Sequence, residues 1–195
     1  NGKTTTTSLI YHIFKNAGYD AGLAGNIGKS LALQVAEEPH EYYIIELSSF
    51  QLDDMYDFRA NIAILLNITP DHLDRYNHDM EEYVKAKFRI TRNMSSEDCF
   101  IFCSDDEITI NHLNKIVVKA KQLPFTQKTE VAQGAFVKDD KIVIRYQDSE
   151  CDMYIRELAL GGRHHVYNSM AAAIAAKVMD IDNGTIREAL SPFQP

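Results

Sequence analysis

The sequence lacks several features that would assign it to other classes of protein. Its 195 residues include only three cysteines, and because these show no C-x-x-C spacing we expect reduced thiols, neither disulfides nor a zinc site. Lys and Arg number 20 against 28 Asp and Glu, and a net charge of −8 without a basic cluster argues against binding nucleic acid or anionic membranes. No apolar run approaches the length of a membrane span and no signal peptide is present, so we expect a cytoplasmic protein.

The remaining composition is ordinary for a globular domain. Hydrophobic residues make up 45% and charged residues 25% of the chain. The length corresponds to one domain or slightly more, enough to bury about 70% of the surface of the unfolded chain.

Hydrophobic periodicity predicts a P-loop NTPase-like α/β fold, a mostly parallel sheet flanked by helices on both faces, with a small antiparallel segment. Apolar runs predict strands at 20–23, 42–45, 61–68 and 100–103, with another beginning at Val117-Val118, and the run at 42–45 is typical of a strand buried on both faces. Helical patterns cover 4–16, 30–36, 81–92, 107–113, 164–179 and 185–190. Apolar and polar residues alternate between 131 and 155, with a turn at Asp139-Asp140, which predicts a hairpin region at one side of the sheet.

The chain begins with Asn1-Gly2-Lys3-Thr4-Thr5, the second half of the phosphate-binding loop G-x-x-x-x-G-K-[ST]. In that loop backbone N–H groups cradle phosphates, the Lys reaches the β- and γ-phosphates, and the Ser/Thr hydroxyl holds Mg²⁺. The alternative is an ordinary helix start. Because the first half of the loop and its strand are missing, we interpret the chain as a piece of a longer protein, trimmed at its N-terminus and its C-terminus.

Ionisable side chains follow two predicted strands. Glu46 follows 42–45, and Asp71, His72 and Asp74 follow 61–68. Ligands bind beyond the carboxyl ends of strands in such sheets, so an acid there suits Mg²⁺ beside a phosphate loop. The alternative for Glu46 is a charge that faces solvent. The alternative for 71–74 is a helix cap with an acidic first turn, which explains Asp71 and Asp74 but not His72.

Two further features are less specific. Lys87 falls within the apolar stripe of the helix at 81–92, either with a packed stem and a surface ammonium or as a neutral, reactive amine. A glycine pair at 161–162 precedes a helix of small residues, in which Asn168 offers the amide donor and acceptor that read an adenine edge. The alternative there is a glycine turn and a packed helix.

Together these segments resemble the central domain of the Mur ligases over nearly the whole chain and in the family's order. The runs that carry the resemblance are 1–5, 25–28 (G-N-I-G), 46–52 (E-L-S-S-F-Q-L), 67–76 (N-I-T-P-D-H-L-D-R-Y), 85–89 (K-A-K-F-R) and 162–168. The first run and D-H-L-D are shared with folyl-polyglutamate synthases, whereas G-N-I-G and E-L-S-S-F-Q-L point to the branch that adds D-glutamate.

The resemblance implies an ATP-dependent amide ligase of peptidoglycan synthesis, with ATP and Mg²⁺ as cofactors. Its substrates would be UDP-N-acetylmuramoyl-L-alanine and D-glutamate, joined through an acyl phosphate, and the intact enzyme would be a monomer. Catalysis of this kind depends on positioning and on neutralising crowded oxyanions.

The resemblance also implies residue roles. Lys3 would contact the β/γ-phosphates within the loop Asn1–Thr5, and Thr4, Glu46 and His72 would bind Mg²⁺. Lys87 would be a carbamylated lysine that holds metal as an anion. Muramoyl contacts would come from Asn26, Ser48 and Gln51, and adenine contacts from His165 and Asn168.

This sequence departs from the family pattern in two respects. The family usually has Asn where His165 stands, and the family's N-terminal uridine-nucleotide domain and C-terminal amino-acid domain have no counterpart in residues 1–195. We therefore expect this piece alone to be inactive. Because the first half of the phosphate loop and its strand are also missing, we expect it to bind ATP weakly or not at all. Two alternatives remain. One is another Mur ligase or a folyl-polyglutamate synthase, against which E-L-S-S-F-Q-L argues. The other is a P-loop GTPase or nucleotide-binding module without ligase activity, and the N-K-x-D motif expected of a GTPase is not found.

Overall fold

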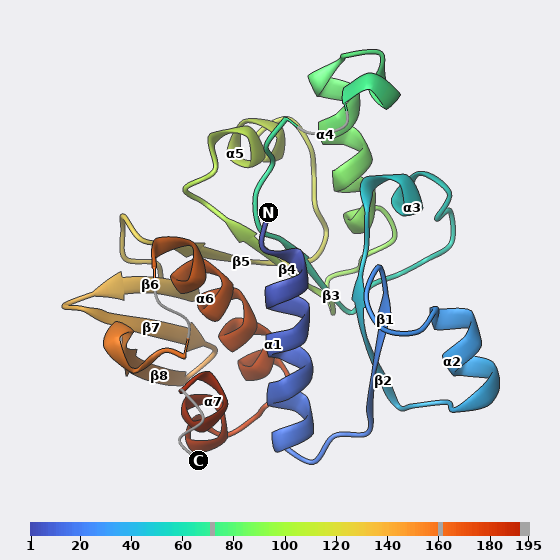
Figure 1. Cartoon of the computed structure of the whole chain (residues 1–195). Coiled ribbons are helices and arrows are strands. Elements are labelled where there is room, and N and C mark those ends of the chain that lie inside the picture. Colours follow the sequence, from blue (N-terminus) through green and yellow to red (C-terminus); the bar gives the residue numbers. More distant parts are fainter. Residues whose placement is uncertain (71–72, 160–161, 192–195) are drawn as a thin grey trace.

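The computed structural model describes residues 1–70, 73–159 and 162–191 (Figure 1). Its helices are α1 (Lys3–Asn16), α2 (Leu31–Glu37), α3 (Ser49–Asp53), α4 (Met80–Phe88), α5 (Glu107–Leu113), α6 (Arg163–Val178) and α7 (Asn183–Leu190), with 3₁₀ turns η1 (Leu73–Tyr76), η2 (Arg89–Thr91) and η3 (Ile155–Glu157). Its strands are β1 (Ala21–Gly25), β2 (Tyr42–Glu46), β3 (Ile62–Leu65), β4 (Cys99–Cys103), β5 (Lys121–Thr126), β6 (Gly134–Lys138), β7 (Lys141–Tyr146) and β8 (Ser149–Tyr154).

The strands form two separate sheets. β1 and β2 pair in parallel, in register from Ala21 opposite Tyr42 to Gly25 opposite Glu46. The other sheet has the order β3-β4-β5-β6-β7-β8, parallel from β3 to β6 and antiparallel from β6 to β8. The predicted fold class is thereby confirmed, including the antiparallel segment at one side.

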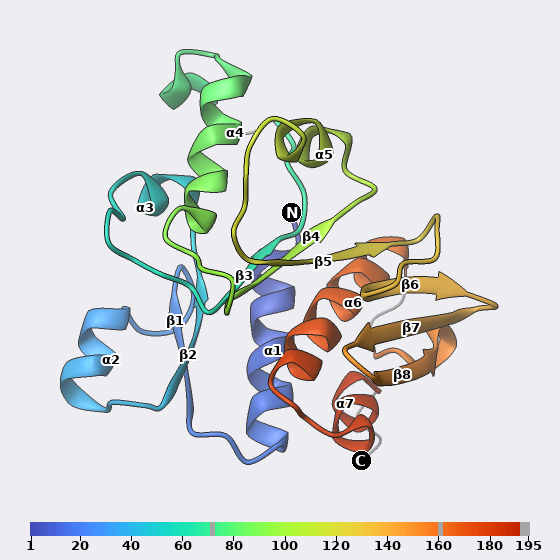
Figure 2. The same ribbon diagram turned by 180° about the vertical axis from the view of Figure 1, so that it is seen from behind.

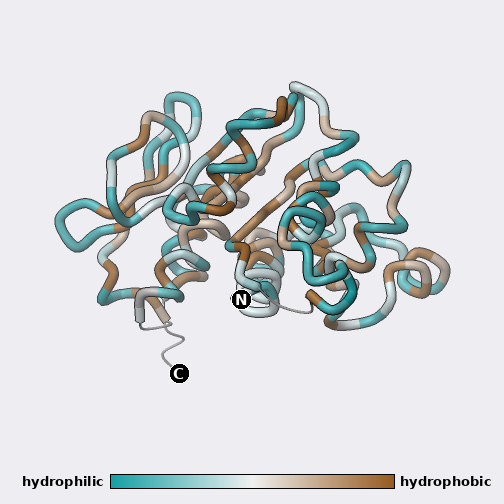
Figure 3. Tube along the Cα trace, turned by 90° about the horizontal axis from the view of Figure 1, so that it is seen from above, coloured by the Kyte–Doolittle hydropathy of each residue, from teal (hydrophilic) through white to brown (hydrophobic). Residues whose placement is uncertain are grey.

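Helices cover both faces of the larger sheet (Figures 1 and 2). On one face α1, α6 and α7 pack through fully buried side chains such as Ile13, Met170 and Ile174. On the other face α4 packs against Phe100 and Phe102 of β4. All five residues of β4 are buried, as expected for a parallel strand between two helical layers. Figure 3 shows the hydrophobic segments gathered in the centre of the molecule and hydrophilic ones in its outer loops.

Turn chemistry explains the antiparallel segment. Asp139 and Asp140 both have positive φ, +48° and +58°, which is the backbone of a two-residue hairpin turn between β6 and β7. Asp tolerates this region better than most residues because its short side chain can bond locally. The predicted hairpin at this position is confirmed.

Several sequence predictions were wrong in detail. No strand begins at Val117, which is 93% exposed; β5 begins at Lys121, where pairing with Cys99 of β4 starts. The helix predicted to reach residue 92 ends at Phe88 and continues only as a 3₁₀ turn. The run at 42–45 was predicted to be buried on both faces, but in β2 only Ile44 and Glu46 are buried. The reason is that no described strand pairs with the second edge of β2.

Two other expectations can be compared with the structure. All three cysteines are free, as predicted, and all three are also buried. Within the part of the chain that the structure describes, no helix has the length and apolar character needed to cross a bilayer.

Candidate functional site

The first turn of α1 begins at a glycine that has a left-handed backbone. Gly2 has φ of +83°, and its carbonyl accepts the N–H of Thr6 at 2.9 Å. A Cβ added to Gly2 would lie only 2.5 Å from Oδ1 of Asn168. Glycine therefore permits both the turn and the close approach of α6 to the start of α1.

Thr4 and Glu46, two of the predicted metal ligands, contact each other directly. The Thr4 hydroxyl donates to Glu46 Oε2 at 2.8 Å, and Glu46, the last residue of β2, is 6% exposed. Across the described residues, no group of three or more His, Cys, Asp and Glu side chains could hold a metal ion. The pair still fits Mg²⁺, which proteins commonly bind through one or two oxygen side chains while phosphate and water supply the other ligands.

The end of β2 is held by the loop that follows β1. Gly25 has φ of +98°, and a Cβ there would overlap the Glu46 carbonyl oxygen. The N–H of Asn26 donates to that same oxygen at 2.9 Å. The predicted substrate residue Asn26 is therefore exposed at the same edge of the sheet as the Glu46 carboxylate.

The end of β3 also meets the start of α1. Asn67 Oδ1 accepts the terminal amine of Asn1 at 3.0 Å, and Asn67 Nδ2 donates to the Asn1 carbonyl at 3.0 Å. The predicted ligand His72 lies outside the described residues, as does Asp71. Asp74 is exposed in η1.

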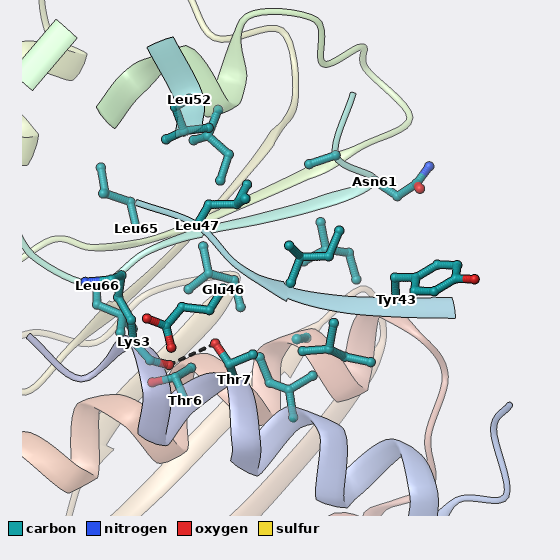
Figure 4. Close-up of a pocket in the computed structure, with 18 of the residues that line it drawn as sticks. Lys3, Thr6, Thr7, Tyr43, Glu46, Leu47, Leu52, Asn61, Leu65 and Leu66 are labelled. Carbon is teal, nitrogen blue, oxygen red and sulfur yellow. Dashed lines mark hydrogen bonds between the residues drawn. The ribbon is translucent and has the colours of Figure 1, made fainter. Parts of the chain in front are cut away.

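A cavity of about 390 Å³ separates β2 from β3 (Figure 4). Residues 41–47 line one side, residues 58–62 and 64–67 line the other, and α1 contributes Lys3, Thr6, Thr7, Ile10 and Phe14. The Thr6 hydroxyl is buried and has no hydrogen-bond partner among the described residues. Figure 4 shows the Glu46 carboxylate directed toward the first turn of α1, beside Lys3.

Both strands that border this cavity run opposite to α1. The end of β2 lies at the first turn of α1 through Thr4, while Tyr42 at its start lies 6.2 Å from the Phe14 ring near the end of that helix. The end of β3 likewise reaches Asn1 through Asn67. β2 and β3 therefore point in the same direction across the cavity, and each presents an edge that no described strand pairs with.

Lys87 lies on the wall of the same cavity as Lys3 and Glu46. The side chain is half-buried on α4, and Nζ lies 4.7 Å from the centre of the Tyr83 ring. The predicted position on the inward stripe of the helix is thus reproduced. Whether the amine carries a carbamate stays a prediction.

Ser48 and Gln51 have a local structural function that the sequence analysis missed. Ser48 is the N-cap of α3, where its hydroxyl accepts the N–H of Gln51 and the Gln51 side chain accepts the N–H of Ser48 at 2.9 Å. The S-x-x-Q spacing is the signal of this capping box. Contact of either residue with a substrate stays a prediction.

His165 and Asn168 lie in the first two turns of α6. Asn168 is 6% exposed and lies against Gly2. His165 Nδ1 is buried without a hydrogen-bond partner within the described residues. A buried ring nitrogen without a partner is a group that a bound ligand would satisfy.

Sequence reasoning missed Asp105, which lies beyond the end of β4. Its carboxylate accepts hydrogen bonds from the Thr126 hydroxyl at 2.6 Å, the Gln127 N–H at 2.7 Å and the Tyr167 hydroxyl at 2.7 Å. Burial alone would raise the pKa of this carboxyl, but the three donors outweigh burial and hold the pKa below its usual value. Ser104 separates Asp105 from the end of β4, so the search for acids at strand ends that located Glu46 would have found Asp105 if extended by one residue.

Comparison with known proteins places these features in a family. Residues 1–176 match the model of the Mur ligase middle domain. The chain is 59% identical over 194 residues to a protein of Bacteroides fragilis named UDP-N-acetylmuramoylalanine–D-glutamate ligase. That alignment covers 100% of this chain and 44% of the relative, so the chain spans less than half the length of the relative.

Solved structures with the same fold have low sequence identity. The structure of UDP-N-acetylmuramoyl-L-alanyl-D-glutamate–2,6-diaminopimelate ligase superposes with a TM-score of 0.73 at 21% identity, covering 97% of this chain and 44% of that one. MurF ligase from Thermotoga maritima in complex with ADP superposes with a TM-score of 0.67 at 15% identity, covering 100% and 47%. With the fold and the sequence match in agreement, this chain belongs to the Mur ligase middle domain family.

Proposed function

We propose that this chain is the nucleotide-binding part of an ATP-dependent ligase that adds D-glutamate to UDP-N-acetylmuramoyl-L-alanine in peptidoglycan synthesis. The observation that carries the proposal is the contact between Thr4 and Glu46 at the first turn of α1. The choice of substrates is supported by the 59% identity to a relative with that name. We refer to the longer protein of which we propose this chain is a part as the parent protein, and we expect it to be a cytoplasmic monomer.

The first turn of α1 would hold the phosphates. Its N–H groups and helix dipole favour an anion at this end, Lys3 would add a positive charge, and Thr4 with Glu46 would hold Mg²⁺. ATP would supply the phosphoryl group that activates a carboxylate, and Mg²⁺ would neutralise phosphate oxygens. His72 would be a further metal ligand, and His165 and Asn168 would contact the base.

Lys87 would supply a negative charge in the parent protein. A neutral amine that captures CO₂ releases one proton and becomes a carbamate, which can bind a metal ion. The half-buried position of the Lys87 side chain on α4 supports this proposal. Asn26, with Ser48 and Gln51 at the start of α3, would face the muramoyl substrate.

We further propose that a β-strand leading into Asn1 fills the cavity between β2 and β3 in the parent protein. Such a strand would run opposite to α1 and hence parallel to both neighbours, whose facing edges are unpaired among the described strands. It would also bury Tyr43, Ile45, Ile62 and Ile64, which are only partly buried. Hydrogen exchange tests this directly: amides of β2 and β3 should be far better protected in the parent protein than in this chain, and equal protection would contradict it.

The proposed reaction is tested by measuring phosphate release by the parent protein. We expect phosphate release that requires ATP, Mg²⁺, UDP-N-acetylmuramoyl-L-alanine and D-glutamate together, and no turnover by residues 1–195 alone. L-glutamate, L-lysine and diaminopimelate serve as amino-acid controls. Turnover with another amino acid and not with D-glutamate would refute the substrate assignment, and ATP-independent behaviour would refute the reaction class.

A further inference from the structure

Asp105 connects three elements at the carboxyl ends of the strands, the end of the fold where we propose that the nucleotide binds. The residue follows β4, its Oδ1 accepts from Thr126 at the end of β5, and its Oδ2 accepts from Tyr167 in α6. The Gln127 N–H supplies a third donor. A carboxylate with three donors is held in one orientation, because each charge-assisted bond adds a geometric constraint.

The bond to Tyr167 adds a polar restraint to the beginning of α6, where the buried side chain of Val166 already packs in the core. Its N-cap is Gly162, which offers no side-chain hydrogen bond to the first turn. Tyr167 also packs its ring against Phe125 of β5, with centroids 6.0 Å apart. The hydroxyl and the ring together fix this turn of α6 to the ends of β4 and β5.

The same turn of α6 carries the two residues that we propose contact the nucleotide. Asn168 follows Tyr167 directly and lies against Gly2, and His165 is two residues earlier with an orphaned ring nitrogen. A shift of this turn would therefore move Asn168 relative to the phosphate loop. Misplacement of positioning groups by about 1 Å is enough to change rates and affinities substantially.

We propose that Asp105 is a positioning residue of the nucleotide site, which acts through Tyr167 to set Asn168 against the first turn of α1 and to fix the turn of α6 that carries His165. This inference rests on the proposed function, because it assumes that a nucleotide binds at this edge. Asp105 itself would not touch the nucleotide. Its effect should appear in the use of ATP and not in the use of the other two substrates.

The test compares three variants of the parent protein. Asp105→Asn keeps the shape but replaces one acceptor oxygen by a donor, and Tyr167→Phe removes only the hydroxyl. The matched control is Asp106→Asn, because the neighbouring Asp106 only caps α5 by accepting from Thr109. We expect the KM for ATP to rise about tenfold in the first two variants, with the KM for D-glutamate unchanged, and to stay within twofold in the control.

The double variant and the wild type complete the design. If both residues act through one bond, Asp105→Asn with Tyr167→Phe should raise the KM for ATP no more than Asp105→Asn alone. The positioning role would be refuted if Tyr167→Phe and Asp105→Asn both kept a KM for ATP within twofold of the wild type. In that case these variants would lower only the melting temperature, as the control does. A wild-type parent protein that binds no ATP would instead refute the proposed function and this inference with it.

Discussion

The substitution Gly25→Ala should destabilise this chain far more than Gly18→Ala. Both glycines have positive φ, +98° and +80°, so alanine carries a backbone penalty of roughly 1–2 kcal/mol at either position. A Cβ at Gly18 meets nothing within 4 Å. A Cβ at Gly25 would lie 3.0 Å from Ile45 Cγ2 and would overlap the Glu46 carbonyl, so the end of β2 must move.

The magnitudes follow from what that movement disrupts. The Glu46 carbonyl accepts the Asn26 N–H, a bond worth about 1 kcal/mol, and overpacking of this kind adds roughly 1–3 kcal/mol. We therefore expect Gly18→Ala to lower the free energy of unfolding by about 1 kcal/mol and Gly25→Ala by about 3–5 kcal/mol. Urea denaturation followed by circular dichroism measures both, with unchanged m-values. Losses that agree within 1 kcal/mol would refute the close-packing argument.

Three further predictions concern single side chains. In the parent protein Glu46→Gln, which keeps an acceptor for Thr4, should reduce turnover about 100-fold while the melting temperature changes little, and near-normal turnover at saturating Mg²⁺ would exclude Glu46 as a metal ligand. Lys87→Ala should lose activity that acetate or formate partly restores; full activity without either acid would rule out the carbamate. Arg59 donates to buried Asp98 and holds the pKa of that carboxyl below its usual value, so the ionised pair contributes stability that is lost as pH falls through that lowered pKa. Arg59→Met should shift this acid loss, measured by thermal unfolding between about pH 2 and 6, to higher pH; an unchanged profile would show that Arg59 does not set the pKa.

Local patterns predicted the elements that build the site, and non-local packing decided the rest. The start of α1, the end of β2 and the position of Lys87 on α4 each follow from residues adjacent in sequence, namely a G-K-T run, an acid after an apolar strand and a 3.6-residue period. The half-exposed state of β2 depends on which strand pairs with its second edge, which the residues of β2 do not encode.

The missed features have the same physical origin. Val117 and Val118 have high β-propensity, but the strand begins at Lys121 because only there does the chain pair with β4. The cluster around Asp105 joins residues 21 and 62 positions away in sequence, through Thr126 and Tyr167. Spacing within the sequence does not reveal contacts between residues so far apart, although the sequence does show an acid, Asp105, shortly after β4.

The most direct test of the central claim is the binding of MgATP to the parent protein and its Lys3→Ala variant, measured by calorimetric titration. Lys15→Ala is the matched control, because Lys15 is also exposed and lies at the other end of α1. If the first turn of α1 holds the phosphates, Lys3→Ala should weaken binding at least tenfold, as loss of a charged hydrogen bond to phosphate implies, and Lys15→Ala should leave it unchanged. Equal MgATP affinity in the wild type and Lys3→Ala would contradict the assignment of this edge as the nucleotide site.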